Sequence, residues 1–111
     1  MRRSGPKLMP WRQKVRYQIS YTEEARRAIP GLPGNYRQRI KREITALADN
    51  PRPARAERLR DDPARINPPE RYKLKLDRWR VIYRVIEEEQ TVRIIRIRLK
   101  RGPETYQGLE D

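Results

Sequence analysis

A chain of 111 residues with 28 lysines and arginines against 15 aspartates and glutamates carries a formal net charge of +13, which favours a polyanionic partner. The length fits one domain, the lack of cysteine and histidine removes the usual zinc ligands, and no apolar stretch is long enough to span a bilayer. We therefore expect a cytoplasmic protein that binds nucleic acid rather than a membrane and that needs no metal or other cofactor.

The chain begins with a basic segment, and we divide it into an arm over residues 1–14, a folded domain over residues 15–106 and a tail over residues 107–111. The arm has five cations, two prolines and no acidic residue, so it is not expected to pack on its own. Apolar and polar residues then alternate over residues 15–21, which predicts a strand.

Two helices are predicted after this strand. Ser20 and Glu23 have the spacing of a capping box, with Thr22 as a competing cap, and a short helix follows to about Ile29. A segment rich in proline and glycine ends it, and a second helix begins at Asn35. Its apolar residues recur at spacings of four, four and three, which predicts a buried face made by Tyr36, Ile40, Ile44 and Leu47.

The second half of the chain is dominated by strand patterns. Residues 57–60 fit a short strand, and residues 71–84 form two alternating segments around a tight turn at Asp77 and Arg78. Pairing across this turn gives one apolar face, with the pairs Leu76–Trp79, Leu74–Val81 and Tyr72–Tyr83. The other face is cationic, with the pairs Lys75–Arg80, Lys73–Ile82 and Arg71–Arg84. Because like charges opposed in a sheet are destabilising, we expect an anion to bind there.

A last strand is predicted over residues 91–100, after an acidic turn at residues 87–89. The pattern leaves its register open. We favour the register that turns Ile95, Ile97 and Leu99 to the core and adds Arg96 and Arg98 to the cationic face. Residue parity does not decide where Arg101 and Tyr106 point, since Gly102 and Pro103 end the strand. The order of elements predicts an α+β domain, with two N-terminal helices packed on one face of a largely antiparallel sheet of four to five strands.

Over most of residues 17–106 the sequence resembles the RelE/ParE superfamily of toxins of type II toxin-antitoxin systems, and within it the RelE branch. The resemblance is carried by residues 72–76, residues 79–85, the acidic turn, and Lys100-Arg101 before Tyr106. It implies a RelE-like fold, cleavage of mRNA in the ribosomal decoding site, and a cognate antitoxin as partner. DNA would be contacted only through the complex with the antitoxin. The segment from Arg101 to Tyr106 departs from the pattern, being one residue shorter than in the best-known member.

The resemblance also implies catalytic positions, which fall on Lys73, Lys75, Arg80, Arg101 and Tyr106. We expect a metal-independent endoribonuclease in which the RNA 2′-hydroxyl attacks phosphorus. Lys75 is the candidate general base, because neighbouring cations disfavour a charged lysine, and Lys73 would hold the phosphate. Arg80 and Arg101 would stabilise developing charge, and Tyr106 would orient a base. Further RNA or ribosome contacts are expected from Arg71, Arg84, Arg96, Arg98 and Lys100.

Two other functions fit the same residues. A ParE-like toxin of this fold inhibits DNA gyrase and cleaves nothing, so it has no need of the lysine pair. A non-catalytic RNA-binding protein would use the five positions for affinity alone. The basic residues of an open sheet face can also serve only to keep the protein soluble.

Overall fold

The computed structural model describes residues 16–109, so the predicted arm over residues 1–14 and the last two residues of the tail lie outside it. Its strands and helices follow in the order β1 (Gln18–Tyr21), α1 (Glu23–Ala28), α2 (Gly34–Leu47), β2 (Ala56–Arg58), β3 (Glu70–Leu76), β4 (Trp79–Ile86) and β5 (Thr91–Leu99). Short 3-10 turns lie between and after them, namely η2 (Ile29–Gly31), η3 (Glu87–Glu89) and η4 (Pro103–Tyr106).

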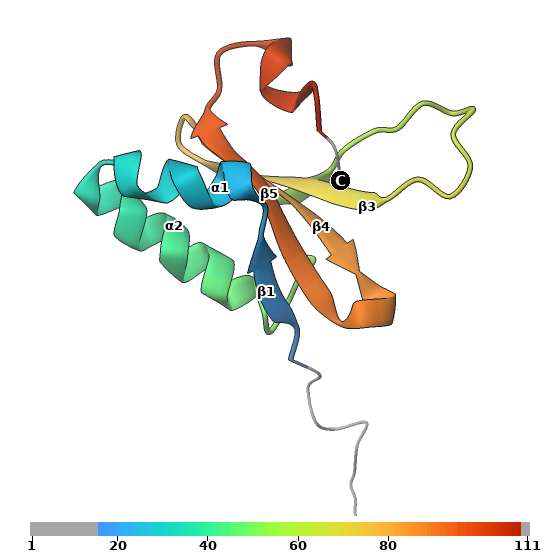
Figure 1. The fold of residues 1–111 in the computed structure, drawn as a ribbon, viewed down its shortest axis with the longest axis horizontal. Coiled ribbons are helices and arrows are strands. Elements are labelled where there is room, and N and C mark those ends of the chain that lie inside the picture. Colours follow the sequence, from blue (N-terminus) through green and yellow to red (C-terminus); the bar gives the residue numbers. More distant parts are fainter. Residues whose placement is uncertain (1–15, 110–111) are drawn as a thin grey trace, which may run out of the picture.

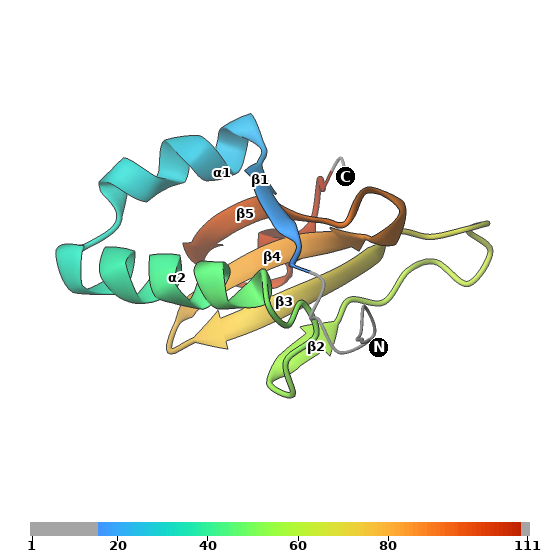
Figure 2. The same ribbon diagram turned by 90° about the horizontal axis from the view of Figure 1, so that it is seen from below.

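The five strands form one sheet in the order β1-β5-β4-β3-β2. Only β1, which pairs with β5, lies parallel to its neighbour, and the other pairings are antiparallel. Both helices pack on the same side of this sheet, and η4 follows the end of β5 (Figures 1 and 2). The predicted fold class, two N-terminal helices on a largely antiparallel sheet, is confirmed. No helix within residues 16–109 is long and apolar enough to cross a membrane.

The first helix starts at Thr22, one of the two caps that the sequence offers. The Thr22 hydroxyl accepts a hydrogen bond from the backbone N–H of Ala25 at 3.1 Å and donates one to the carbonyl of Ile95 at 2.7 Å. One side chain thus caps α1 and fastens it to β5, which explains why the sheet and the helix meet at this point.

The core lies between α2 and the sheet. The predicted stripe of α2 is buried at Ile40, Ile44 and Leu47 and half-buried at Tyr36. It packs on the apolar face of the β3–β4 hairpin, whose register is the predicted one in every pair, from Leu76 with Trp79 to Arg71 with Arg84. The tight turn and the apolar pattern together fix this register. A slip by one residue would turn the apolar side chains to the opposite face.

The predicted register of β5 is wrong at Ile95, because a β-bulge interrupts its pairing with β4. Ile82 faces Arg96 and the next residue, Tyr83, faces Ile94, so Ile95 has no partner on β4. Ile94 therefore takes the place in the main core that was expected of Ile95, which is buried outside it. Beyond the bulge Ile97 enters the core as predicted. The extra residue restores the expected parity for the rest of the strand.

The short edge strand also differs from the prediction, covering Ala56–Arg58 instead of residues 57–60. One more backbone hydrogen bond follows it, from the N–H of Leu59 to the carbonyl of Arg71 at 2.9 Å. The chain then leaves the sheet in a loop that projects beside β3 (Figure 1). Pro63, Pro68 and Pro69 lie in this loop, where their missing N–H groups break no ladder bond.

A polar network joins the segment after α2 to two parts of the sheet. Arg52 donates hydrogen bonds to the carboxylates of Glu70 and Glu87. The hydroxyl of Tyr17 donates to Glu87 at 2.8 Å, and that of Tyr72 donates to Glu70 at 2.6 Å. The hydrogen bonds from Arg52 lower the pKa of both carboxyl groups. The network therefore holds β3 and the β4–β5 turn to one arginine, and Tyr17, just before β1, is joined to that turn.

Shortening a core side chain of α2 tests this packing. Ile44→Ala is expected to lower the free energy of unfolding by about 2–5 kcal/mol, because it leaves a cavity between the helix and the sheet. Urea unfolding followed by circular dichroism measures the change. Arg42→Ala, at an exposed position of the same helix, is the control and is expected to change stability by less than about 0.5 kcal/mol. Equal stability of the two variants would contradict the assigned core.

The network around Arg52 predicts a dependence of stability on pH. Glu70 and Glu87 have a folded pKa below the ordinary value, so their contribution is present above that value and is lost as the pH falls through the folded pKa. Arg52→Met should therefore destabilise the protein at neutral pH and have a smaller effect in acid. Urea unfolding at about pH 7 and about pH 3 measures both effects. A destabilisation that is the same at both values would contradict the network.

Candidate functional site

The open face of the sheet carries cations in rows that run across its strands. The register places Lys75, Arg80 and Arg98 in one row, and Lys73, Ile82 and Arg96 in the next. A third row consists of Arg71, Arg84 and Arg93. These basic residues make up the cationic face in the structure, and Arg93 is the member that the predicted set lacks. The first and third rows bring positive charges onto neighbouring strands, whereas in the second row Ile82 on β4 separates Lys73 from Arg96.

The two lysines of β3 share one carboxylate. Glu57 lies on β2, opposite Lys73 in the register, and its Oε1 lies 3.4 Å from Lys73 Nζ. Its Oε2 lies 3.1 Å from Lys75 Nζ. The hydrogen bond from Lys75 is the main reason that the pKa of Glu57 is lowered. A negative charge therefore sits between the candidate base and its neighbour. The sequence prediction missed it, because the pattern did not place the short edge strand beside β3.

Tyr106 comes to the lysine pair from the segment after β5. Lys73 Nζ lies 4.9 Å from the centre of its ring, within the range of a cation–π contact. The chain turns at Gly102, whose φ of 145° is a backbone conformation that residues with a side chain rarely adopt, so glycine is favoured there. Tyr106 Oη is buried and has no hydrogen-bond partner among residues 16–109. The position that residue parity left open is thus beside Lys73.

Arg96 holds this C-terminal segment in place. Its guanidinium donates hydrogen bonds to the carbonyl of Thr105 at 3.1 Å and to the carbonyl of Gln107, the two residues that flank Tyr106. It also donates to Glu24 on α1, at 2.6 and 3.2 Å, and only 7% of its side chain is exposed. The structure therefore places Arg96 as an anchor beneath the segment, whereas the sequence analysis expected it to contact RNA or the ribosome.

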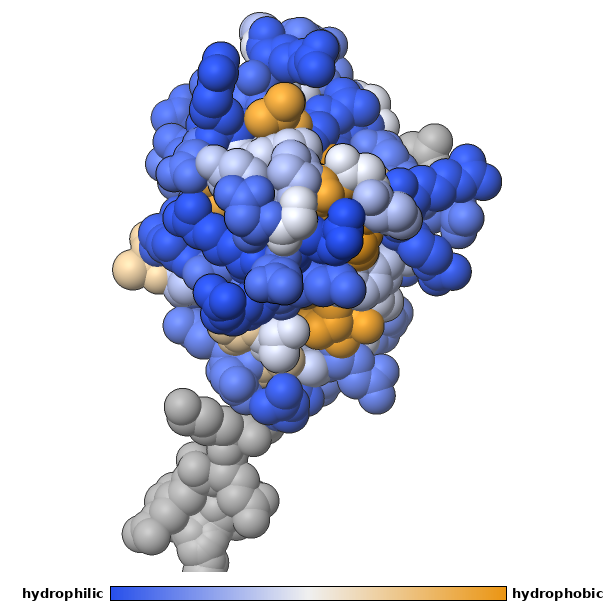
Figure 3. All heavy atoms as spheres, turned by 90° about the vertical axis from the view of Figure 1, so that its left-hand side faces the viewer, coloured by the Kyte–Doolittle hydropathy of each residue, from blue (hydrophilic) through white to orange (hydrophobic). Residues whose placement is uncertain are grey.

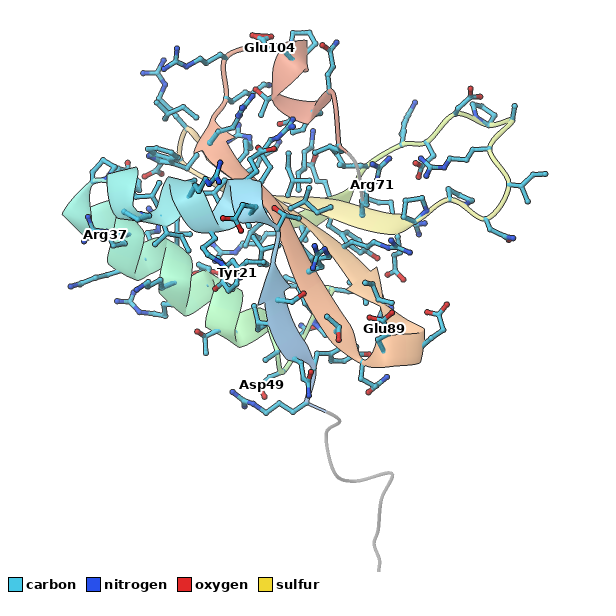
Figure 4. All side chains as sticks on the ribbon, viewed as in Figure 1. Tyr21, Arg37, Asp49, Arg71, Glu89 and Glu104 are labelled. Atoms are coloured by element: carbon cyan, nitrogen blue, oxygen red, sulfur yellow. The ribbon has the colours of Figure 1, made fainter. Side chains whose placement is uncertain are left out.

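Arg71 and Arg80 are also largely buried. Arg71 donates to Asp61 of the projecting loop at 2.7 Å, and Figure 4 shows it where that loop joins β3. Arg80 Nη1 donates to the carbonyls of Asp77 and Trp79, at 2.7 and 2.9 Å. Arg80 Nε has no hydrogen-bond partner among the described residues. These bonds hold the guanidinium of Arg80 in a fixed position, which suits electrostatic stabilisation.

Arg101 lies at a neighbouring cavity of about 550 Å³, formed by the α1–η2 segment, the end of β5 and η4. Trp79, Leu99 and Arg98 line the same cavity, so Arg98 belongs both to it and to the cationic face. Lys100 is exposed just beyond β5. Hydrophilic side chains cover most of the side of the molecule where the helices connect, with apolar patches between them (Figure 3).

The five predicted catalytic residues are thus only partly brought together. Lys73 contacts Tyr106, Lys75 shares Glu57 with Lys73, and Arg80 faces Lys75 in the register. Arg101 lines the adjacent cavity, and Arg98 connects that cavity with the row of Lys75 and Arg80. Within residues 16–109, no group of three or more carboxylates is placed to hold a metal ion. The arrangement places cations where a phosphate group could bind and an aromatic ring where a nucleobase could stack.

The sequence and the fold match known toxins. Residues 15–102 match the family described as the ParE toxin of the type II toxin-antitoxin system parDE. The structure is similar to a mutant of E. coli toxin RelE in the free state, with a TM-score of 0.68 and 25% identity, over 85% of this chain and 94% of that one. No curated protein matches the sequence.

Two complexes share the fold at lower identity. The RelBE2 toxin-antitoxin complex from Mycobacterium tuberculosis gives a TM-score of 0.63 and 23% identity, covering 81% of this chain and 98% of that one. The archaeal RelE–RelB complex from Pyrococcus horikoshii gives 0.65 and 21%, covering 78% and 97%. These likenesses concern the fold.

The anchoring role of Arg96 predicts a local effect of its removal. Arg96→Met should release the segment over residues 103–108, so its backbone amides should exchange hydrogen with solvent at least about tenfold faster. Hydrogen exchange followed by mass spectrometry measures this. Glu24→Gln, which weakens the ion pair but leaves the two carbonyl hydrogen bonds, should have a smaller effect. Unchanged protection in Arg96→Met would show that other contacts hold Tyr106.

Proposed function

The chain belongs to the ParE toxin family, within the RelE/ParE superfamily of type II toxins, and from this membership we propose that it is a ribosome-dependent mRNA endonuclease of the RelE type. The observation that carries the proposal is the meeting of Lys73, Lys75 and Tyr106, with Arg80 facing Lys75 across the hairpin. Cations for phosphates and an aromatic ring for a nucleobase are what proteins use to bind single-stranded RNA, and cations can also stabilise the charge that develops at phosphorus.

In the proposed reaction the RNA provides its own nucleophile. The 2′-oxygen attacks the adjacent phosphorus as Lys75 takes its proton, and the bond from phosphorus to the 5′-oxygen breaks as that oxygen takes a proton from water. The products are a 2′,3′-cyclic phosphate and a 5′-hydroxyl. Lys75 is assigned as the general base and Lys73 as the phosphate ligand. Arg80 stabilises the negative oxygens on phosphorus, and Tyr106 orients a nucleobase of the RNA.

Arg101 is assigned to the leaving oxygen. Because a guanidinium releases protons reluctantly, its role is electrostatic stabilisation instead of proton donation. The set contains no histidine, which is the usual acid or base at neutral pH, so catalysis depends strongly on how the RNA is positioned. We assign that positioning to the ribosome, which would hold mRNA in its decoding site. Free RNA is then a poor substrate.

The remaining exposed cations are proposed contacts to RNA or ribosome. Arg98 and Lys100 are exposed at the end of β5, and Arg84 is half-buried with its Nε unpartnered among the described residues. Arg71 and Arg96 support the face from within. The further partner is a cognate antitoxin, which would silence the toxin. Ribosome and mRNA would place the activity in the cytoplasm, and DNA would be reached only through the antitoxin complex.

A second function is favoured by one observation, the description of the matching family as ParE toxin. A ParE-like protein would inhibit DNA gyrase and would cleave no RNA. It would use the cationic face for binding alone. An assay of gyrase supercoiling separates the two functions, because the RNase predicts no inhibition there and the gyrase inhibitor predicts no cut message.

Primer extension on ribosome-bound mRNA tests the proposal. The wild-type protein should cut the message in the decoding site, and Arg80→Ala combined with Arg101→Ala should lower the cleavage rate at least about 100-fold, since two groups that stabilise charge are lost. Lys41→Ala combined with Arg42→Ala removes the same charge from exposed positions of α2, away from the cationic face, and should cut at close to the wild-type rate. An intact message with the wild type, or undiminished cutting by the first double variant, would contradict the proposal.

A further inference from the structure

Glu57 stands out because it is an acid inside the cationic face. It lies on the edge strand β2, with its side chain 53% exposed, and its two oxygens reach two different lysines, at 3.4 Å from Lys73 Nζ and 3.1 Å from Lys75 Nζ. Asp61 and Glu24, the other acids near this face, pair with the buried guanidinium groups of Arg71 and Arg96. Those two pairs serve the fold, whereas Glu57 and Lys75 are about half exposed and Lys73 is 23% exposed.

The carboxylate of Glu57 has the geometry of a bound phosphate. A phosphodiester, like a carboxylate, presents two anionic oxygens from one centre, and each can accept from a separate ammonium group. Each ammonium group has three N–H donors, so Glu57 does not block either lysine, but its negative charge offsets part of their positive charge and it occupies one contact on each. Because the carboxylate is exposed and joined to its strand by a flexible side chain, an entering phosphate can take its place without unfolding anything.

We propose that Glu57 is a specificity-determining residue that competes with RNA phosphate for Lys73 and Lys75. This inference rests on the proposed function, since it concerns RNA at the same site. RNA that is free in solution must displace the carboxylate with its own binding energy alone. RNA held in the decoding site is already in position, so the displacement costs less of its affinity. Glu57 thereby directs the protein toward positioned RNA and away from other polyanions, which its net charge of +13 would otherwise attract.

Binding of a single-stranded RNA that cannot be cleaved tests this. The probe is a fluorescein-labelled oligonucleotide with 2′-O-methyl groups throughout, measured by fluorescence anisotropy over a range of salt concentrations. Glu57→Gln should bind it about tenfold more tightly than the wild type at low salt, and its salt dependence should steepen by about 0.7 in the log–log slope, as expected for one more phosphate contact. Circular dichroism checks that the variant is folded.

Two controls separate local competition from a general effect of charge. Glu88→Gln makes the same change at an exposed position of the β4–β5 turn, and should tighten binding by less than about twofold. In a protein that also carries Lys73→Gln and Lys75→Gln, the change Glu57→Gln should no longer tighten binding. Equal effects of Glu57→Gln and Glu88→Gln, a gain that persists without the lysines, or no measurable binding by any variant would overturn the inference.

The outcome is independent of cleavage, because the probe lacks the nucleophile. Tighter binding by Glu57→Gln together with intact ribosome-bound mRNA would contradict the proposed RNase activity and still support competition between Glu57 and RNA phosphate. Cleavage by the wild type together with unchanged binding by Glu57→Gln would support the RNase activity and contradict the competition.

Discussion

Like charges face one another across neighbouring strands of this sheet, and the fold tolerates them because acids from outside the β3–β4 hairpin reach each row. Glu57 of β2 contacts Lys73 and Lys75, Asp61 of the projecting loop contacts Arg71, and Glu24 of α1 contacts Arg96. Like charges directly opposed would otherwise destabilise a sheet. The neighbouring strand, the loop and the helix therefore act together as counter-ions for one surface.

This arrangement divides the cations into two groups. Arg71 and Arg96 are buried, and Arg96 donates hydrogen bonds to the segment that carries Tyr106. Their positive charges pair with Asp61 and Glu24 and so stabilise the fold. Lys73 and Lys75 share a displaceable partner, and Arg80, although as buried as Arg71, is held by two backbone carbonyls of its own hairpin. The second group is where an anionic ligand gains the most from binding, so the site and the fold use the same charges in different ways.

The sequence predicted the parts that strong local patterns determine. The tight turn at Asp77 and Arg78 fixed the hairpin register, and the α2 stripe followed from helical spacing. The bulge at Ile95 was missed, because a single extra residue in an apolar run leaves no mark on the alternation. Glu57 was missed and the position of Tyr106 was left open because each depends on a long-range contact, namely the pairing of a three-residue strand and the carbonyl bonds of Arg96.

The central claim is that this basic surface breaks an RNA linkage through the RNA's own 2′-hydroxyl, with lysine, arginine and tyrosine side chains alone. The ends of the fragments test it most directly, because they record which oxygen attacked phosphorus. Mass spectrometry of fragments recovered from ribosomes should find a 2′,3′-cyclic phosphate, or the 3′-phosphate that forms from it, on one side and a 5′-hydroxyl on the other. Fragments with a 3′-hydroxyl and a 5′-phosphate, the ends left by attack of water with the 3′-oxygen as leaving group, would contradict the account.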